Sequence, residues 1–185
     1  MIKFRIDDEL VIREFTEADA ACVFAAVKDN YEHLKRFMIW SKPDYSLVDA
    51  QEFLAKSIED AKKENSLGFG IFRVENLIGA IGFSRFDCSA GTTEIGYWID
   101  RREEGKGIIL RASQLLIEYA FTELKLNRVE IRCSSENLRS AAIPERLGFI
   151  KEGVLRQSQF IKGKLHDFLV YGLLRSEWRK SEPPA

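Results

Sequence analysis

The sequence has few of the residues that build disulfide frameworks or metal centres. It contains the cysteines Cys22, Cys88 and Cys133, without CxxC spacing, and the histidines His33 and His166, far apart in the chain. An odd number of scattered cysteines argues against a disulfide scaffold or a structural zinc site, so no metal is expected. A Ser-His-Asp or Cys-His hydrolase is also disfavoured, because neither histidine lies in the context of a catalytic base.

Long apolar runs and an excess of one charge are missing as well. No stretch approaches the roughly 18 apolar residues of a membrane span, and Asp7 and Asp8 interrupt the start before a signal-type region could form. The 28 basic and 29 acidic side chains leave a net charge of −1. This balance argues against a direct nucleic-acid partner or a membrane surface. We therefore expect a cytoplasmic protein that recognises a small or local partner.

The composition is that of one globular domain with alternating strands and helices. The 185 residues are 45% hydrophobic and 11% aromatic, which predicts a single domain over residues 1–180 and a frayed tail over 181–185. The apolar periodicity predicts strands at 10–15, 67–75, 77–86, 93–100 and 128–134, and two more within 154–174 that fold about 162–164. It predicts helices at 16–28, 31–38, 46–65, 107–124 and 138–147.

A glycine-bearing turn between a predicted strand and a predicted helix is the most informative motif. The run Glu94-Ile-Gly-Tyr-Trp-Ile-Asp is followed by Arg102-Glu-Glu-Gly-Lys-Gly. A turn that opens directly onto a helix offers unpaired N–H groups and the positive end of the helix dipole, which together bind phosphates. Spacing alone fits an ordinary glycine turn equally well. Neither a Walker loop nor a dinucleotide fingerprint fits, since Leu110 occupies the third glycine position.

The motifs resemble those of the GCN5-related N-acetyltransferases, the GNAT family. Arg102 to Gly107 matches that family's acyl-CoA motif, [RQ]-x-x-G-x-[GA]. Downstream, Asn137-Leu-Arg-Ser and the later Gly148-Phe149 are similar to its second motif. The Ile-Gly-Tyr-Trp-Ile run and the loop around Trp40 resemble the RimJ/RimL branch, which acetylates the N-termini of ribosomal proteins. The resemblance extends from Leu10 to Leu174.

The resemblance implies an α/β fold with a mixed, mostly antiparallel sheet that is splayed at its centre and flanked by helices. Acetyl-CoA, as acyl-donor cosubstrate, would lie between the strand ending at Asp100 and the strand ending at Ser134. Its pantetheine arm would pair with the first of these strands, its pyrophosphate would meet the turn, and its thiol end would approach Asn137 and Cys133. The implied cofactor-binding residues are Trp98, Ile99, Asp100, Arg102, Gly105, Lys106, Gly107, Ile108, Ile109, Cys133 and Asn137.

Several of these residues have a simpler explanation that the sequence leaves open. Asn137 can be a helix cap, Lys106 a solvated lysine, and Cys133 a core residue that shares a strand face with Val129 and Ile131. An activated thioester needs no covalent help from the protein, so Cys133 is not expected to act as a nucleophile.

The catalytic residues that the resemblance implies are Ser140, as proton donor to the thiolate, and Glu94, as proton acceptor for the amine. Ordered water is the alternative acceptor. Gln159 stands where RimL-like proteins have a glutamate, and an amide cannot take a proton, so Gln159 is assigned to substrate binding together with Trp40. Core packing is the alternative for Trp40. Pro144 departs from the pattern too and should kink the helix behind Ser140.

The sequence therefore predicts an acetyl-CoA-dependent N-acetyltransferase that works by direct transfer, with a ribosomal-protein N-terminus as the leading acceptor and a homo-oligomeric assembly. Two alternatives remain. The acceptor is a small amine such as a polyamine or aminoglycoside, which a strongly acidic pocket would favour. Otherwise the chain binds CoA without turnover, as Gln159 and Pro144 suggest.

Overall fold

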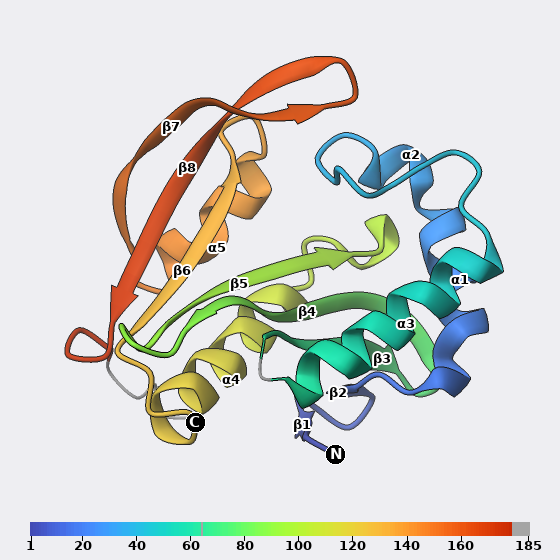
Figure 1. Ribbon diagram of the computed structural model, residues 1–185, viewed down its shortest axis with the longest axis horizontal. Helices are drawn as coiled ribbons and strands as arrows, with labels where there is room; N and C mark the ends of the chain where they lie inside the picture. Colours follow the sequence, from blue (N-terminus) through green and yellow to red (C-terminus); the bar gives the residue numbers. More distant parts are fainter. Residues whose placement is uncertain (64, 179–185) are drawn as a thin grey trace.

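A computed structural model describes residues 1–63 and 65–178 (Figure 1). The expected frayed tail at 181–185 lies outside these residues. The strands are β1 (Lys3–Arg5), β2 (Leu10–Glu14), β3 (Leu67–Arg73), β4 (Asn76–Asp87), β5 (Thr92–Ile99), β6 (Arg128–Ser134), β7 (Ile150–Ile161) and β8 (Lys164–Leu174). The helices are α1 (Ala20–Asp29), α2 (Tyr31–Leu34), α3 (Leu47–Lys62), α4 (Ile108–Thr122) and α5 (Leu138–Arg146), with 3₁₀ turns η1 (Glu17–Asp19) and η2 (Arg101–Glu103).

The strands form an eight-stranded sheet in the order β1-β2-β3-β4-β5-β6-β8-β7. Its pairs are antiparallel except for β5 and β6, which run parallel. The β5–β6 ladder covers only residues 92–94 against 128–130, and beyond it the two strands diverge (Figure 1). The predicted α/β fold with a mixed sheet splayed at its centre is confirmed.

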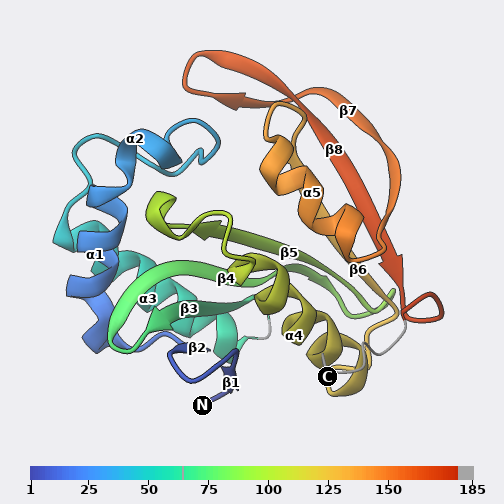
Figure 2. The same ribbon diagram turned by 180° about the vertical axis from the view of Figure 1, so that it is seen from behind.

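Helices cover both faces of the sheet and bury its apolar side chains. In Figure 1, α1 and α3 lie in front of the sheet, and Figure 2 shows α4 and α5 on the opposite face. Leu54 of α3 and Leu116 of α4 are almost fully buried. Burying one such side chain contributes about 1.5–3 kcal/mol. Each face thus has its own apolar cluster, which packs the helices against the sheet.

Most predicted elements are present, with shifted ends. The strand β1 was not predicted, because three residues show no clear alternation; it forms by pairing with β2. The helical piece expected over 31–38 ends at Leu34, and the helix expected to reach residue 65 ends at Lys62. The strand β7 begins at Ile150 rather than at 154. Pro144 lies inside α5 without ending it.

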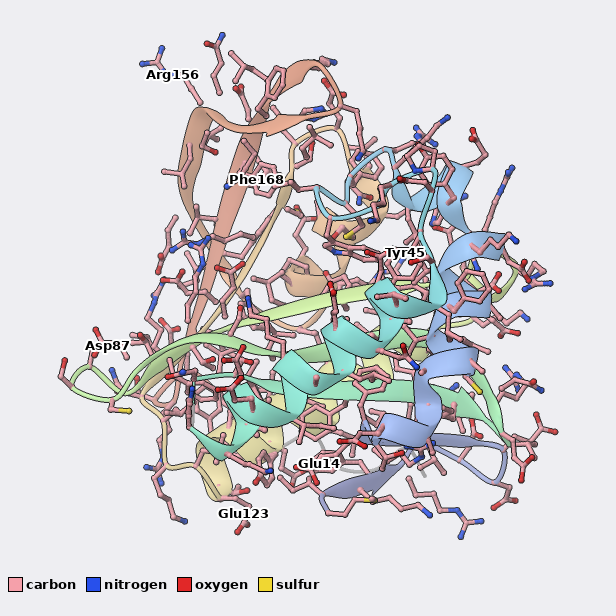
Figure 3. The ribbon with its side chains drawn as sticks, turned by 45° about the vertical axis from the view of Figure 1, so that its right-hand side comes forward. Glu14, Tyr45, Asp87, Glu123, Arg156 and Phe168 are labelled. Atoms are coloured by element: carbon pink, nitrogen blue, oxygen red, sulfur yellow. The ribbon has the colours of Figure 1, made fainter. Side chains whose placement is uncertain are left out.

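The β7–β8 hairpin and the loop after α2 approach each other above the splay. The turn contains Lys162 at φ +46° and Gly163 at φ +87°, as the predicted turn at 162–164 requires. The Lys162 Nζ donates a hydrogen bond to the carbonyl oxygen of Ser41 in the loop. In Figure 3, Arg156 near the middle of β7 lies at the top of the molecule, and Asp87 at the end of β4 lies at the left. Within residues 1–63 and 65–178, no helix is long and apolar enough to cross a membrane.

Candidate active site

The turn between β5 and α4 presents a row of free backbone N–H groups. Gly105 and Gly107 adopt φ values of +76° and +69°, a conformation that side chains with a Cβ disfavour. Within the described residues, no backbone acceptor is bonded to the N–H groups of residues 105–109. They lie at the N-terminus of the 15-residue helix α4, where the helix dipole is positive. The predicted turn is therefore built like an anion-binding site.

Asp100 fixes the entrance to this turn through its side chain. Its carboxylate accepts hydrogen bonds from the Arg102 backbone N–H at 2.8 Å and from the Arg102 guanidinium at 2.6 Å. These bonds lower the pKa of Asp100 to about 2 although burial opposes them. The Asp100 N–H donates to the Ile78 oxygen at 2.7 Å, and its carbonyl accepts from Glu103 at 2.9 Å. The backbone of Asp100 is thus already engaged and is not free to pair with a pantetheine arm.

The open edge of β5 consists of the residues beyond Glu94. The Asp100 N–H binds β4, and in an antiparallel pair the backbone groups of alternate residues point to the same neighbour, so those of Trp98 also point to β4. The backbone groups of Tyr97 and Ile99 therefore point towards the splay. Tyr97 and Ile99 are therefore the residues whose main chain can add an extended ligand. Ile99 was assigned this role from the sequence, whereas Trp98 contributes its side chain instead.

Charged side chains surround the turn in fixed pairs. The Lys106 Nζ lies 3.0 Å from Glu103, which also binds Arg73 at 2.9 Å. Half of the Lys106 side chain is exposed, so a phosphate can compete for it. A hollow of about 320 Å³ adjoins residues 100–102 and is lined by basic and acidic side chains, among them Arg102 and Glu32. Arg102 and Lys106 are the cations beside the turn, and each is paired with a carboxylate in the protein alone.

A larger cavity lies elsewhere. It has a volume of about 600 Å³ and is lined by residues of the N-terminus, α3, β3 and α4, among them Ile2, Ser57, Leu67 and Tyr119. It does not include the turn or the open edge of β5. We locate the candidate site by its free polar groups rather than by this volume, because acyl-CoA binding needs donors for phosphate.

The start of α5 places three predicted residues together. Asn137 caps the helix by accepting a hydrogen bond from the Ser140 N–H at 3.2 Å, as predicted. Among the described residues, the Asn137 amide nitrogen has no partner, so it can still donate to a ligand. Cys133 is 5% exposed and belongs to the core with Ile131, which confirms its predicted packing. Burial raises the pKa of the Cys133 thiol to about 11, so the nucleophilic thiolate is disfavoured.

Glu94 lies where β5 and β6 separate, opposite Glu130 in the ladder. Its carboxylate oxygen is 3.4 Å from the Arg85 Nε and 3.5 Å from the Arg132 Nε, and it accepts no hydrogen bond from the described residues. Burial raises the pKa of Glu94, and the two arginines oppose this effect. A buried carboxylate with a raised pKa is suited to accept a proton. The arginine neighbours were not predicted from the sequence.

Trp40 lies beside Trp98 rather than in the core. Its side chain is 46% exposed, and its ring lies 6.4 Å from the ring of Trp98 on β5. Gln159 is half-buried on β7 and pairs with His166 on β8. Trp40, Trp98 and Gln159 thus come from the loop, the open strand and the hairpin that surround the splay.

A buried pair of polar side chains, Ser134 and His166, was missed by the sequence analysis. The Ser134 Oγ lies 3.1 Å from the His166 Nδ1, and a Glu136 oxygen lies 3.9 Å from the same nitrogen. Serine and carboxylate share one ring nitrogen, so this is not the relay of a serine hydrolase, in which they use different nitrogens. The two residues meet because β6 and β8 pair in antiparallel register, and no sequence pattern indicates that pairing.

Comparisons with known proteins agree with this geometry. The model of the family described as "Acetyltransferase (GNAT) domain" matches residues 9–150. The chain is 34% identical to the Bacillus subtilis protein named "Putative ribosomal N-acetyltransferase YdaF", over 96% of this chain and 98% of that protein. It is 29% identical to the Escherichia coli ribosomal-protein-serine acetyltransferase, over 90% and 93% of the two chains. The crystal structure of the microcin C7 self-immunity acetyltransferase MccE with acetyl-CoA and AMP has a TM-score of 0.85 and 26% identity, covering 91% of this chain and 94% of that one. Sequence motifs, splayed sheet and family match together make this chain a member of the GNAT family of N-acetyltransferases.

Proposed function

We propose that the protein transfers the acetyl group of acetyl-CoA to the N-terminal α-amine of a ribosomal protein, by direct attack in a ternary complex. The observation that carries the donor half is the row of free N–H groups at residues 105–109 beside the open edge of β5. The acceptor half is supported by two relatives named for ribosomal acetylation. MccE, bound to acetyl-CoA, supports the choice of donor.

The donor would lie along the splay. The N–H groups of Gly105, Lys106, Gly107, Ile108 and Ile109 would hold its pyrophosphate. Its extended amide arm would add to the edge of β5 as a short strand. The free amide of Asn137 would then donate to the arm near its thiol end, and the tethered guanidinium of Arg102 would face the phosphates.

The chemistry needs positioning and two proton transfers. The lone pair of the acceptor nitrogen attacks the thioester carbon, the C–S bond breaks, and the sulfur leaves as a thiolate. Glu94 takes the proton that the amine must lose, because its raised pKa suits this task at neutral pH. Ser140 gives a proton to the leaving thiolate and takes one back from water, while Glu94 releases the amine proton to water, so both residues return to their starting state. Cys133 lies near the same end and remains a neutral thiol.

The acceptor face favours a peptide over a polyamine. A polycation would need bare carboxylates, but Glu94 and Glu130 on this face each lie within ion-pair distance of arginine. Trp40 and Trp98 offer flat aromatic surface, which suits the first side chains of a peptide. Gln159 would hydrogen-bond the peptide backbone from the hairpin.

The test is acetylation of total ribosomal proteins with labelled acetyl-CoA, followed by mass spectrometry of the modified protein. We expect label on the N-terminal residue of one ribosomal protein and initial-rate kinetics of a ternary complex. Spermidine and an aminoglycoside serve as competing small amines. Faster turnover of either small amine, or label on lysine side chains alone, would overturn the proposed acceptor. Binding of acetyl-CoA without transfer to any amine would overturn the proposed activity.

A further inference from the structure

The helix α5 lacks one hydrogen bond of its own. Proline has no backbone N–H, so Pro144 cannot donate to the carbonyl oxygen four residues earlier. That oxygen belongs to Ser140, the residue proposed to donate to the leaving sulfur. A helix carbonyl left without a donor in a partly buried position costs free energy, so a substitute donor is expected.

Tyr97 of β5 supplies the substitute across the splay. Its hydroxyl donates a hydrogen bond to the Ser140 carbonyl oxygen at 3.1 Å. The same hydroxyl oxygen accepts a hydrogen bond from the Ser140 Oγ at 3.2 Å. One phenol therefore binds both the main chain and the side chain of Ser140, and this uses its donor and an acceptor site at once.

The surroundings keep this arrangement in one protonation state. Burial raises the pKa of the Tyr97 hydroxyl, so it stays protonated and remains a donor. Burial also raises the pKa of the Cys133 thiol, to about 11. Tyr97, Ser140 and Cys133 thus form a small neutral cluster between the diverging ends of β5 and β6.

We propose that Tyr97 is the positioning residue of the reaction: it holds the Ser140 hydroxyl oxygen at the place where the thiol leaves, because Pro144 has freed the Ser140 carbonyl to receive the Tyr97 hydrogen bond. The Ser140 proton, which points to the Tyr97 oxygen in the protein alone, turns to the sulfur as the thiolate forms. This inference rests on the proposed function, since it assumes that Ser140 serves the leaving sulfur. Pro144 is then not a defect of α5. The missing N–H of Pro144 leaves the Ser140 carbonyl free. Tyr97 on β5, the strand along which acetyl-CoA would lie, can therefore fix the orientation of Ser140.

The contact is tested first without any activity measurement. Tyr97→Phe removes two hydrogen bonds, to the carbonyl oxygen and to the Oγ of Ser140, and should lower Tm by about 4–8 °C in a chain of this size. In a Pro144→Ala background the new N–H can serve the Ser140 carbonyl, so the same change should lower Tm by about half as much. Equal losses in the two backgrounds would overturn the link between Tyr97 and Pro144. Tyr119→Phe, which removes a phenol without a hydrogen-bond partner among the described residues, is the matched control.

The catalytic part is tested by steady-state kinetics with acetyl-CoA and an acceptor peptide that carries a free N-terminal amine. Tyr97→Phe should lower kcat about tenfold and leave KM for acetyl-CoA unchanged, as for an interaction that acts in the transition state. In a Ser140→Ala background, Tyr97→Phe should cause no further loss. An equal loss in both backgrounds would overturn the positioning role and leave the role of Ser140 intact. Wild-type kcat in Ser140→Ala alone would overturn the role of Ser140, and this inference with it.

Discussion

Replacing Glu94 with glutamine should lower activity while leaving the fold as stable or more stable. If Glu94 takes the amine proton, Glu94→Gln should reduce kcat/KM by roughly 10²–10⁴. The loss should shrink at high pH, because an α-amine with a pKa near 8 then supplies its own free base. The measurement is the pH profile of kcat/KM for the variant and the wild type.

The expected stability of Glu94→Gln follows from the surroundings of the Glu94 carboxylate. At an effective dielectric constant near 20, each arginine at 3.4 and 3.5 Å attracts Glu94 by about 5 kcal/mol. The Arg85 side chain is 59% exposed, so water screens its share. The cost of burying the charge is also several kcal/mol. Because the pKa of Glu94 is raised in the fold, the cost of burial exceeds the attraction.

The pH dependence of the stability follows from the raised pKa of Glu94. A raised folded pKa means that the neutral form of Glu94 is favoured in the fold, so its contribution to stability is present below its unfolded pKa. That contribution is lost as the pH rises through the folded pKa. Glutamine is neutral at every pH. The Tm of Glu94→Gln should therefore equal that of the wild type at low pH and be equal or up to about 2–4 °C higher at neutral pH.

Glu130 is the matched control, since it faces Glu94 across the ladder. Burial alone would raise its pKa, but hydrogen bonds from Arg132 and Arg128 lower it. Its contribution to stability is thus present at neutral pH and is lost as the pH falls through the folded pKa. Glu130→Gln should lower Tm at neutral pH and keep most activity. A Glu94→Gln variant with a lower Tm and wild-type kcat/KM would refute the reasoning and make Glu94 a structural ion-pair partner.

The remaining predictions concern the donor turn, the buried thiol and the hairpin. Gly107→Val should weaken acetyl-CoA binding at least tenfold in calorimetry, because a β-branched residue disfavours φ +69° and obstructs close approach; Gly163→Val, with the same backbone cost at a distant turn, should bind normally. Cys133→Ala should keep most turnover, and ping-pong kinetics or an acetyl-cysteine found by mass spectrometry would contradict this. Gln159→Ala should raise KM for the acceptor a few-fold, and a loss as large as that of Glu94→Gln would assign Gln159 a catalytic part.

Local features of the fold were predictable because they depend on nearby residues. The helix cap at Asn137 and the turn at Gly163 follow from side-chain hydrogen bonds and from backbone freedom within a few positions. The core placement of Cys133 followed from strand alternation. The ends of α2 and β7 did not follow, because tertiary contacts decide where a helix or strand stops.

The contacts that build the site were beyond sequence reasoning. Tyr97 meets Ser140 across the splay, and Ser134 meets His166 across the β6–β8 ladder, 32 positions later in the chain. The engagement of the Asp100 backbone depends likewise on β4. Such pairs depend on strand order and register, which local periodicity does not encode. The sequence motif at residues 102–107 was enough to predict the turn, but the residues that surround the turn are brought there by long-range strand pairing.

Amide hydrogen exchange with and without acetyl-CoA tests the central claim most directly. The free N–H groups of residues 105–109 should exchange rapidly in the protein alone, because they have no acceptor within the described chain. Acetyl-CoA should slow their exchange together with that of Tyr97 and Ile99 at the open edge of β5. Unchanged exchange at this turn, with protection instead around Ser57 and Tyr119 in the 600 Å³ cavity, would contradict the site.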